Sequence, residues 1–190
     1  MNPSVSAFDR FSEDYDQWFD DNAGIYTTQV DLLRRYIPAG TRTLEAGVGS
    51  GRFASLLGIG HGLDPSLRLL AMAKRRGLET VLGKGEFLPY RDGIFDRVLM
   101  MTVICFMEDA ARSFHETFRV LQPGGMLVVA FLEKGGDIAL REEGSGGRFF
   151  RYARFFSATE VIATLAGAGF SYIMVRERRY GLCVITAGKK

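Results

Sequence analysis

Cysteine and histidine are scarce in this sequence. Its 190 residues include two of each, and the cysteines, at positions 105 and 183, are too few and too separated to suggest a disulfide framework or a zinc site. We therefore expect no bound metal. Free thiols favour the reducing cytoplasm as the compartment.

Long apolar runs and an excess of one charge are also lacking. The longest apolar candidates, such as residues 126–132, have the length of a buried strand and fall short of a membrane span. The first residues lack the basic-then-apolar pattern of a signal peptide. A net charge of +2 gives no electrostatic footprint for nucleic acid or an anionic membrane. We expect the protein to be a monomer or homodimer and to act on neither nucleic acid nor a membrane.

What the sequence does contain is a regular alternation of short apolar runs and amphipathic segments, which is typical of βα units around a mostly parallel sheet. A capping box at Ser157–Glu160 opens one of the later helices. The pattern predicts a doubly wound α/β fold in a single domain over residues 1–190. Strands are expected at 41–46, 59–63, 79–82, 96–101, 126–132, 171–175 and 182–186, the last two joined by 177–181, and a mobile loop at 133–151.

The stretch LEAGVGSGRF, residues 44–53, carries most of the functional information. Glycines at 47, 49 and 51 allow positive φ and a close approach of backbone to a ligand. A dinucleotide-binding turn needs its third glycine at position 52, which here is arginine. Glu45 would also repel a pyrophosphate. A ligand with an ammonium and a sulfonium, as in S-adenosylmethionine, would instead be attracted.

Asp64 follows the second expected strand, at about the twenty-residue offset where an acid accepts both hydroxyls of a ribose. The sequence Asp64-Pro-Ser66 is equally suited to capping the next helix. One carboxylate has enough acceptor sites for both roles. An acid at this position also disfavours a ribose that carries a 2′-phosphate.

Four blocks in this order, LEAGVGSGRF, GLDPS, GKGEFLPYRDGIFDRVLM and FRVLQPGGMLVV, resemble the class I S-adenosylmethionine-dependent methyltransferases of the UbiE/SmtA-like (type 11) family. The likeness runs from about residue 15 to 170. It implies a Rossmann-like, seven-stranded sheet with the last strand antiparallel. The cofactor-binding residues that it implies are Glu45, Gly47, Gly49, Gly51, Asp64, Pro65, Ser66, Gly85, Glu86, Phe87, Met101 and Thr102.

One departure from the family pattern follows the third strand, where an acid often holds the amino group of adenine. This sequence has Lys84 there. We expect adenine to be recognised by the backbone at Gly85 and Glu86 and Lys84 to point to solvent.

Aromatic residues gather before the first strand and after the fifth. Residues 1–36 and the loop at 133–151 would overhang the strand ends, where open α/β sheets bind ligands, and we expect them to form a lid. Core packing explains some of these rings. Arg154 fits a solvent-exposed face as well as it fits the binding of an acidic substrate. The candidates for lid or substrate contacts are Tyr15, Trp18, Tyr26, Phe106 and Arg154.

The expected activity is methyl transfer from S-adenosylmethionine to a small molecule by in-line displacement, leaving S-adenosylhomocysteine. No catalytic residue is assigned, because positioning matters more than acid–base groups in this chemistry. The chain has no Asn-Pro-Pro-Tyr or Asp-Pro-Pro-Tyr after the fourth strand, which disfavours amino-methylation of adenine. The alternatives are a non-catalytic module that binds S-adenosylmethionine and a nicotinamide-dependent oxidoreductase, which Arg52 and Glu45 disfavour.

Overall fold

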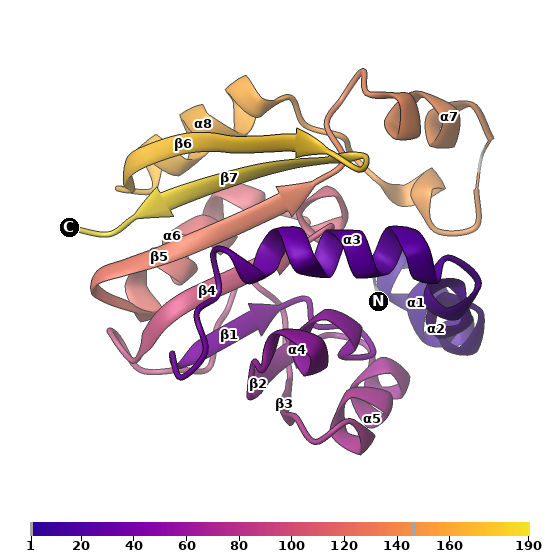
Figure 1. Ribbon diagram of the computed structural model, residues 1–190, viewed down its shortest axis with the longest axis horizontal. Coiled ribbons are helices and arrows are strands. Elements are labelled where there is room, and N and C mark those ends of the chain that lie inside the picture. Colours follow the sequence, from indigo (N-terminus) through magenta and orange to yellow (C-terminus); the bar gives the residue numbers. More distant parts are fainter. Residues whose placement is uncertain (1, 146) are drawn as a thin grey trace.

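The computed structural model describes residues 2–145 and 147–190, which form a seven-stranded sheet with helices on both faces (Figure 1). The strand order is β3-β2-β1-β4-β5-β7-β6. Strands β1 to β5 pair in parallel, and β7 is antiparallel to both of its neighbours. The predicted sheet with its antiparallel last strand is therefore confirmed. The strands are β1 (Thr43–Ala46), β2 (His61–Asp64), β3 (Glu79–Leu82), β4 (Phe95–Met101), β5 (Leu121–Phe131), β6 (Ser171–Arg179) and β7 (Leu182–Gly188).

Two layers of helices sandwich the sheet, and a third group covers one end of it. In Figure 1 the arrows of β1, β4 and β5 point toward α1, α2 and α7, so these helices lie at the carboxyl ends of the parallel strands. The helices are α1 (Pro3–Arg10), α2 (Ser12–Asp21), α3 (Ala23–Arg34), α4 (Arg52–Leu57), α5 (Leu67–Arg75), α6 (Ala110–Val120), α7 (Asp137–Ser145) and α8 (Ala158–Gly167), with two 3₁₀ turns, η1 (Ile104–Phe106) and η2 (Phe150–Tyr152).

The hydrophobic core is split by the sheet into two clusters. Side chains alternate between the two faces of a strand, and β5 shows this directly: Val128 and Ala130 join the cluster under α3, α4 and α5, whereas Leu127 and Val129 join the cluster under α6 and α8. Both faces of β5 are thus buried. This explains why its sequence is an almost unbroken apolar run.

The parallel strands all end at one edge, and each is followed by a tight turn. Gly51 begins α4 and Gly58 ends it, both with positive φ, at +83° and +72°. Ser66 caps α5, where its side chain accepts a hydrogen bond from the Leu69 amide. Short turns of this kind keep the ends of β1, β2 and β4 close together, which creates the site described below.

Two details of the sequence-based prediction are wrong. Residues 133–151 are not one loop, because α7 and η2 form within them. Ala139 is buried and Ile138 packs against the core cluster, so tertiary burial outweighs the low helix propensity of the surrounding glycines. Residue 146 falls outside the described residues. The final hairpin is also tighter than expected: β6 runs to Arg179, and Tyr180 and Gly181 alone form the turn, both with positive φ.

The segment 133–156 is closed at its base. Glu133 and Phe156 form an isolated parallel bridge, and the Lys134 amide donates to the Phe156 carbonyl at 2.9 Å. The Glu133 carboxylate also accepts from the Ala158 amide at 3.2 Å and pairs with Arg178 at 2.7 Å. Both ends of this segment are therefore fixed to the sheet.

Candidate functional site

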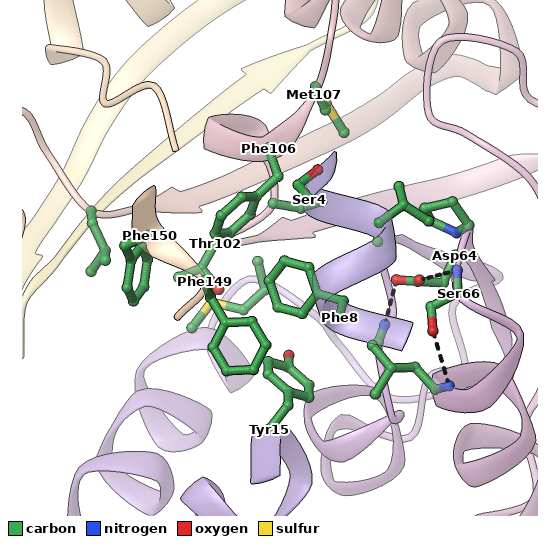
Figure 2. Close-up of a pocket in the computed structure, with 18 of the residues that line it drawn as sticks. Ser4, Phe8, Tyr15, Asp64, Ser66, Thr102, Phe106, Met107, Phe149 and Phe150 are labelled. Carbon is green, nitrogen blue, oxygen red and sulfur yellow. Dashed lines mark hydrogen bonds between the residues drawn. The ribbon is translucent and has the colours of Figure 1, made fainter. Parts of the chain in front are cut away.

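A cavity of about 390 Å³ lies at the carboxyl ends of the strands, beneath α1 and α2. This volume is in the range of small-ligand pockets. Figure 2 shows that its wall has two parts. The sheet side consists of the ends of β1, β2, β3 and β4 with the turns that follow them. The aromatic side consists of Phe8, Tyr15, Phe106, Phe149 and Phe150.

The glycine-rich turn after β1 forms the floor of the sheet side. Gly47 has φ of +80°, and a Cβ there would overlap the side chain of Val103. Gly49 has φ of +53°, and a Cβ there would lie 3.0 Å from the Tyr15 hydroxyl. The Gly47 amide donates to the Leu63 carbonyl at 2.7 Å, which ties the turn to β2. Only glycine adopts positive φ readily and also leaves room for such close neighbours. The turn can therefore bring its backbone close to a ligand.

Asp64, at the end of β2, is held by backbone donors from both sides. Its two carboxylate oxygens accept from the Gly49 and Ser66 amides, each at 2.9 Å. Burial raises the pKa of Asp64 to about 6, although these two hydrogen bonds oppose the shift. Each oxygen keeps lone-pair capacity toward the cavity. Asp64 therefore both fixes the glycine turn and offers acceptors to a ligand.

Glu45 is a fully buried acid behind the turn. Burial, reinforced by the charge of Asp64, raises its pKa well above the usual range. Among the described residues no donor reaches its Oε2 atom. A buried oxygen without a donor favours a cationic or hydrogen-bonding group nearby.

The segment after β3 closes one end of the sheet side. Gly85 and Glu86 line the cavity, and the Glu86 carboxylate accepts from the Glu108 amide at 2.9 Å. Lys84 was expected to point to solvent; its side chain is 41% exposed and pairs with the Glu108 carboxylate at 2.9 Å, and the residue also lines the cavity. Phe87 turns outward, where its ring is 59% exposed and stacks on the Arg112 guanidinium.

The aromatic side is assembled from segments far apart in the sequence. The Phe8 ring of α1 stacks on Phe149 with centroids 4.8 Å apart and meets Phe106 edge-on at 4.9 Å. Tyr15 of α2 meets Phe8 edge-on at 5.4 Å. Phe106 and Phe150 are 5.8 Å apart. Edge-to-face contacts of this kind are favourable beyond simple burial, so these rings hold α1 and α2 over the cavity.

Charged residues attach the same two helices to the sheet side. Arg52, at the position where a dinucleotide-binding turn has glycine, pairs with Asp16 at 2.8 Å and Asp20 at 2.6 Å. Arg76 also reaches Asp16, at 2.9 Å. Hydrogen bonds from Arg52 and Arg76 lower the pKa of Asp16 to about 2, despite its partial burial. Arg52 therefore serves to anchor α2.

The structure brings most of the predicted site residues to the cavity. On its wall are Gly47, Gly49, Asp64, Pro65, Ser66, Gly85, Glu86, Met101, Thr102, Tyr15, Trp18 and Phe106. Others have different contacts: Gly51 packs against Ala73 of α5, the Tyr26 hydroxyl donates to the Arg52 carbonyl at 2.5 Å, and the Arg154 guanidinium lies over Phe156. Glu45 and Phe87 also lie outside the wall.

Sequence reasoning placed residues 1–36 in a lid but missed two residues of α1. Phe8 is central to the aromatic side, and Asp9 accepts a hydrogen bond from Ser66 at 2.8 Å. The available signal was the sequence PSVSAFDR with a proline in its first turn, which suits a short helix. In the described ranges, no group of three or more histidine, cysteine or acidic side chains is placed to hold a metal ion. Nor does any helix there have the length and apolar character needed to cross a membrane.

These residues fit S-adenosylmethionine. The glycine cradle admits backbone contact, and Asp64 offers acceptors for ribose hydroxyls. When ionised, Asp64 also suits a ligand with positive charges and no phosphate. The strand order and the position of the cavity are those of the class I S-adenosylmethionine-dependent methyltransferases.

Comparison with known proteins supports the same class. A family model described as a methyltransferase domain matches residues 44–129. The protein MJ1123 of Methanocaldococcus jannaschii is 38% identical over 171 residues, which cover 89% of this chain and 83% of that one. The malonyl-(acyl-carrier protein) O-methyltransferase of Geobacter sulfurreducens is 30% identical, with 90% of this chain and 70% of that enzyme covered. The chain spans 63% of the length of a Mycobacterium tuberculosis relative to which it is 41% identical.

A solved structure gives the same result. The Thermotoga maritima protein described as an S-adenosylmethionine-dependent methyltransferase, possibly a histamine N-methyltransferase, superposes with a TM-score of 0.89 at 30% identity, covering 98% of this chain and 100% of that one. The chain belongs to the type 11 family of S-adenosylmethionine-dependent methyltransferases.

Proposed function

We propose that this methyltransferase acts on a small acceptor with a mainly apolar, uncharged surface, which binds against the aromatic side of the cavity. The observation that carries the proposal is the ring cluster of Phe8, Phe106 and Phe149, which lies beside Met101 and Thr102 at the end of β4. Bound S-adenosylmethionine supplies a methyl group on a sulfonium for direct in-line transfer. Asp64 would accept the ribose hydroxyls, the Gly47–Gly49 backbone would hold the methionine end, and Gly85 and Glu86 would flank adenine.

The charges near the aromatic side favour an uncharged acceptor. Arg148 pairs with Asp14, and Arg141 lies 3.3 Å from Glu142. The Arg154 guanidinium lies over the Phe156 ring at 4.9 Å. An acidic acceptor would compete with these partners for the guanidinium groups, whereas an apolar group needs only the rings.

The groups nearest the rings act by positioning. Burial, followed by the charges of Asp64 and Glu45, raises the pKa of the Tyr15 hydroxyl above its usual value, so this group stays protonated and cannot act as a general base near neutral pH. Burial raises the pKa of the Cys105 thiol to about 12, which removes it as a nucleophile near neutral pH. In the part of the chain that the structure describes, neither histidine lies on the cavity wall. The residues would thus exclude water and align the acceptor with the methyl group.

The cellular setting that we propose is the cytoplasm, with the enzyme acting as a monomer or homodimer and without nucleic acid or membrane as its substrate. The support is the pair of buried, unbridged cysteines, 105 and 183, which suit a reducing compartment.

The test uses S-adenosylmethionine with a labelled methyl group and a cell extract divided into a low-mass filtrate and the retained macromolecules. We expect label to enter a compound of the filtrate, with S-adenosylhomocysteine formed in equal amount. Follow-up acceptors should be neutral aromatic compounds, with amines related to histamine and acyl-carrier-protein thioesters, the classes that the relatives named above suggest, as competing acceptors whose preference would contradict the proposal. Label confined to the macromolecules, or only to acidic metabolites, would contradict the proposal.

One variant tests whether the acceptor binds at the aromatic side. Phe106→Leu removes one ring from the aromatic side and leaves the sheet side intact. We expect KM for the acceptor to rise about tenfold, as for loss of a well-packed ring, with unchanged affinity for S-adenosylhomocysteine. Weaker binding of S-adenosylhomocysteine instead would place Phe106 at the cofactor.

A further inference from the structure

Asp9 of α1 makes an unusual contact with the start of α5. Its Oδ1 atom accepts from the Ser66 hydroxyl at 2.8 Å and from the Arg68 amide at 3.1 Å. The first amides of a helix have no partner within the helix. Ser66 satisfies Leu69, and Asp9 satisfies Arg68. The start of α5 is therefore capped twice, once from its own sequence and once from α1.

Ser66 links this contact to the site of the cofactor. Its amide donates to Asp64 at 2.9 Å, while its hydroxyl donates to Asp9. Asp64 in turn accepts from the Gly49 amide. A continuous chain of hydrogen bonds thus runs from the glycine turn through Asp64 and Ser66 to the lid helix α1. Figure 2 shows Asp64 and Ser66 to the right of α1, the helix that carries Phe8.

Asp9 and its neighbour Phe8 contact different parts of the structure around the cavity. Phe8 stacks on Phe149 and contacts Phe106, whereas Asp9 grips the start of α5. Movement of α1 would break both sets of contacts together, because consecutive residues of one helix carry them. The negative charge of Asp9 adds to the effect of burial in raising the pKa of Asp64. This repulsion is offset by the favourable field at the start of α5.

We propose that Asp9 is a positioning residue which, through Ser66, couples ribose binding at Asp64 to closure of α1 over the aromatic side. The proposal rests on the role of Asp64 given under the proposed function. Ligand hydroxyls on Asp64 fix the carboxylate, the carboxylate fixes Ser66, and Ser66 presents its hydroxyl to Asp9. When Asp9 is bound, Phe8 is placed in the ring cluster. Occupancy of the cofactor site would thereby complete the acceptor site.

The test measures the dissociation rate of S-adenosylhomocysteine from wild type, Asp9→Ala and Asp9→Asn. Trp18 is the only tryptophan of the chain and lies on the cavity wall, so its fluorescence reports on lid and ligand. We expect dissociation about tenfold faster in Asp9→Ala, as for loss of hydrogen bonds to a charged group. Asp9→Asn should stay within about threefold of wild type, because asparagine caps helices about as well as aspartate.

The control is Asp31→Ala, which removes an exposed acid of α3 whose partner, Arg34, is 3.9 Å away. Hydrogen exchange adds a readout that a purely structural cap would not change: S-adenosylhomocysteine should protect α1 in wild type and not in Asp9→Ala. Equal dissociation rates and equal protection in Asp9→Ala and Asp31→Ala would overturn the coupling alone. Absence of any binding by wild type would overturn the proposed function with it.

Discussion

The sheet side and the aromatic side of the cavity are built in different ways. The sheet side is held mainly by backbone: the Gly47 amide is bound to β2, and Asp64 accepts from two further amides. The aromatic side is held by rings and ion pairs that join α1 and α2 to distant segments. Backbone contacts within adjacent βα units persist as long as the sheet does. Contacts between a lid and a sheet can open without unfolding either.

Among the substitutions that test the difference between the two sides of the cavity, we expect Gly47→Ala to have the largest effect. The substitution places a Cβ into Val103 and forces alanine to φ of +80°, a conformation that costs about 1–2 kcal/mol by itself. We expect affinity for S-adenosylhomocysteine to fall at least about a hundredfold, or about 2.7 kcal/mol, by calorimetric titration.

Gly40→Ala is the matched control for that variant. Gly40 has the same φ of +80°, and a Cβ there meets nothing within 4 Å. It should therefore show the backbone cost in the melting temperature and no change in affinity. Equal loss of affinity in both variants would mean that the glycine turn acts through global stability.

The second effect is that of Asp64→Asn, which acts on both roles of this residue. Asparagine keeps one acceptor oxygen and turns its NH2 group toward the Gly49 or the Ser66 amide, so the melting temperature of the ligand-free protein should also fall. A carboxylate binds hydroxyl donors more strongly than an amide does, and we expect affinity for S-adenosylhomocysteine to fall at least about tenfold. Asp109→Asn is the control, because Asp109 caps α6 through the Arg112 amide at 2.9 Å. Unchanged affinity in Asp64→Asn would show that the ribose is held elsewhere.

The third effect is a pH dependence that belongs to the sheet side alone. The pKa of Asp64 is about 6 in the folded protein against a usual 3.8, so its ionised form predominates only above about pH 6. Affinity for S-adenosylhomocysteine should fall as pH is lowered through that value, by titration between about pH 5 and pH 8, and Asp64→Asn should lack the step. The free energy of unfolding of the ligand-free protein should change in the opposite direction. Between the two pKa values Asp64 carries more proton in the folded protein than in the unfolded chain, so Asp64 adds stability as pH falls.

The smallest effect is that of Arg52→Ala, which loosens the lid. Arg52 loses its bonds to Asp16 and Asp20, but Arg76 still holds Asp16. Solvent also reaches the Asp20 side chain, which is 54% exposed. We therefore expect a loss of S-adenosylhomocysteine affinity of less than about threefold, together with faster hydrogen exchange in α2. Arg34→Ala, which breaks an exposed pair in α3, should change neither. Unchanged exchange in Arg52→Ala would show that the rings alone hold α2.

The contrast also explains what the sequence predicts. The glycine turn and Asp64 lie within one βαβ unit, residues 44–66, where local order fixes the geometry, and the sequence predicted both positions on the cavity wall. The contact between Asp9 and Ser66 joins residues 57 apart, and that between Arg52 and Asp16 joins residues 36 apart. No local pattern reveals such pairs.

Aromatic residues also show what the sequence alone cannot predict. Tyr15 and Tyr26 look alike in the sequence, yet Tyr15 lines the cavity while Tyr26 packs in the core and bonds to the Arg52 carbonyl. A ring near a strand end satisfies either environment, and the path of α2 and α3 decides between them. The helix α7 was missed for a related reason, because burial of its residue Ala139 against the core stabilises it more than the helix propensity of its sequence does.

The bridge between Glu133 and Phe156 makes the segment that it closes an exchangeable cassette. Its two ends lie side by side next to the sheet, so a segment of another length can span the same two points. Lengthening a closed loop costs only about 0.6 kcal/mol for each doubling. Phe149 and Phe150 belong to this cassette, and Ile138 and Ala139 anchor it in the core, so an insertion away from these residues can reshape the acceptor wall while the backbone contacts of Gly47 and Asp64 remain.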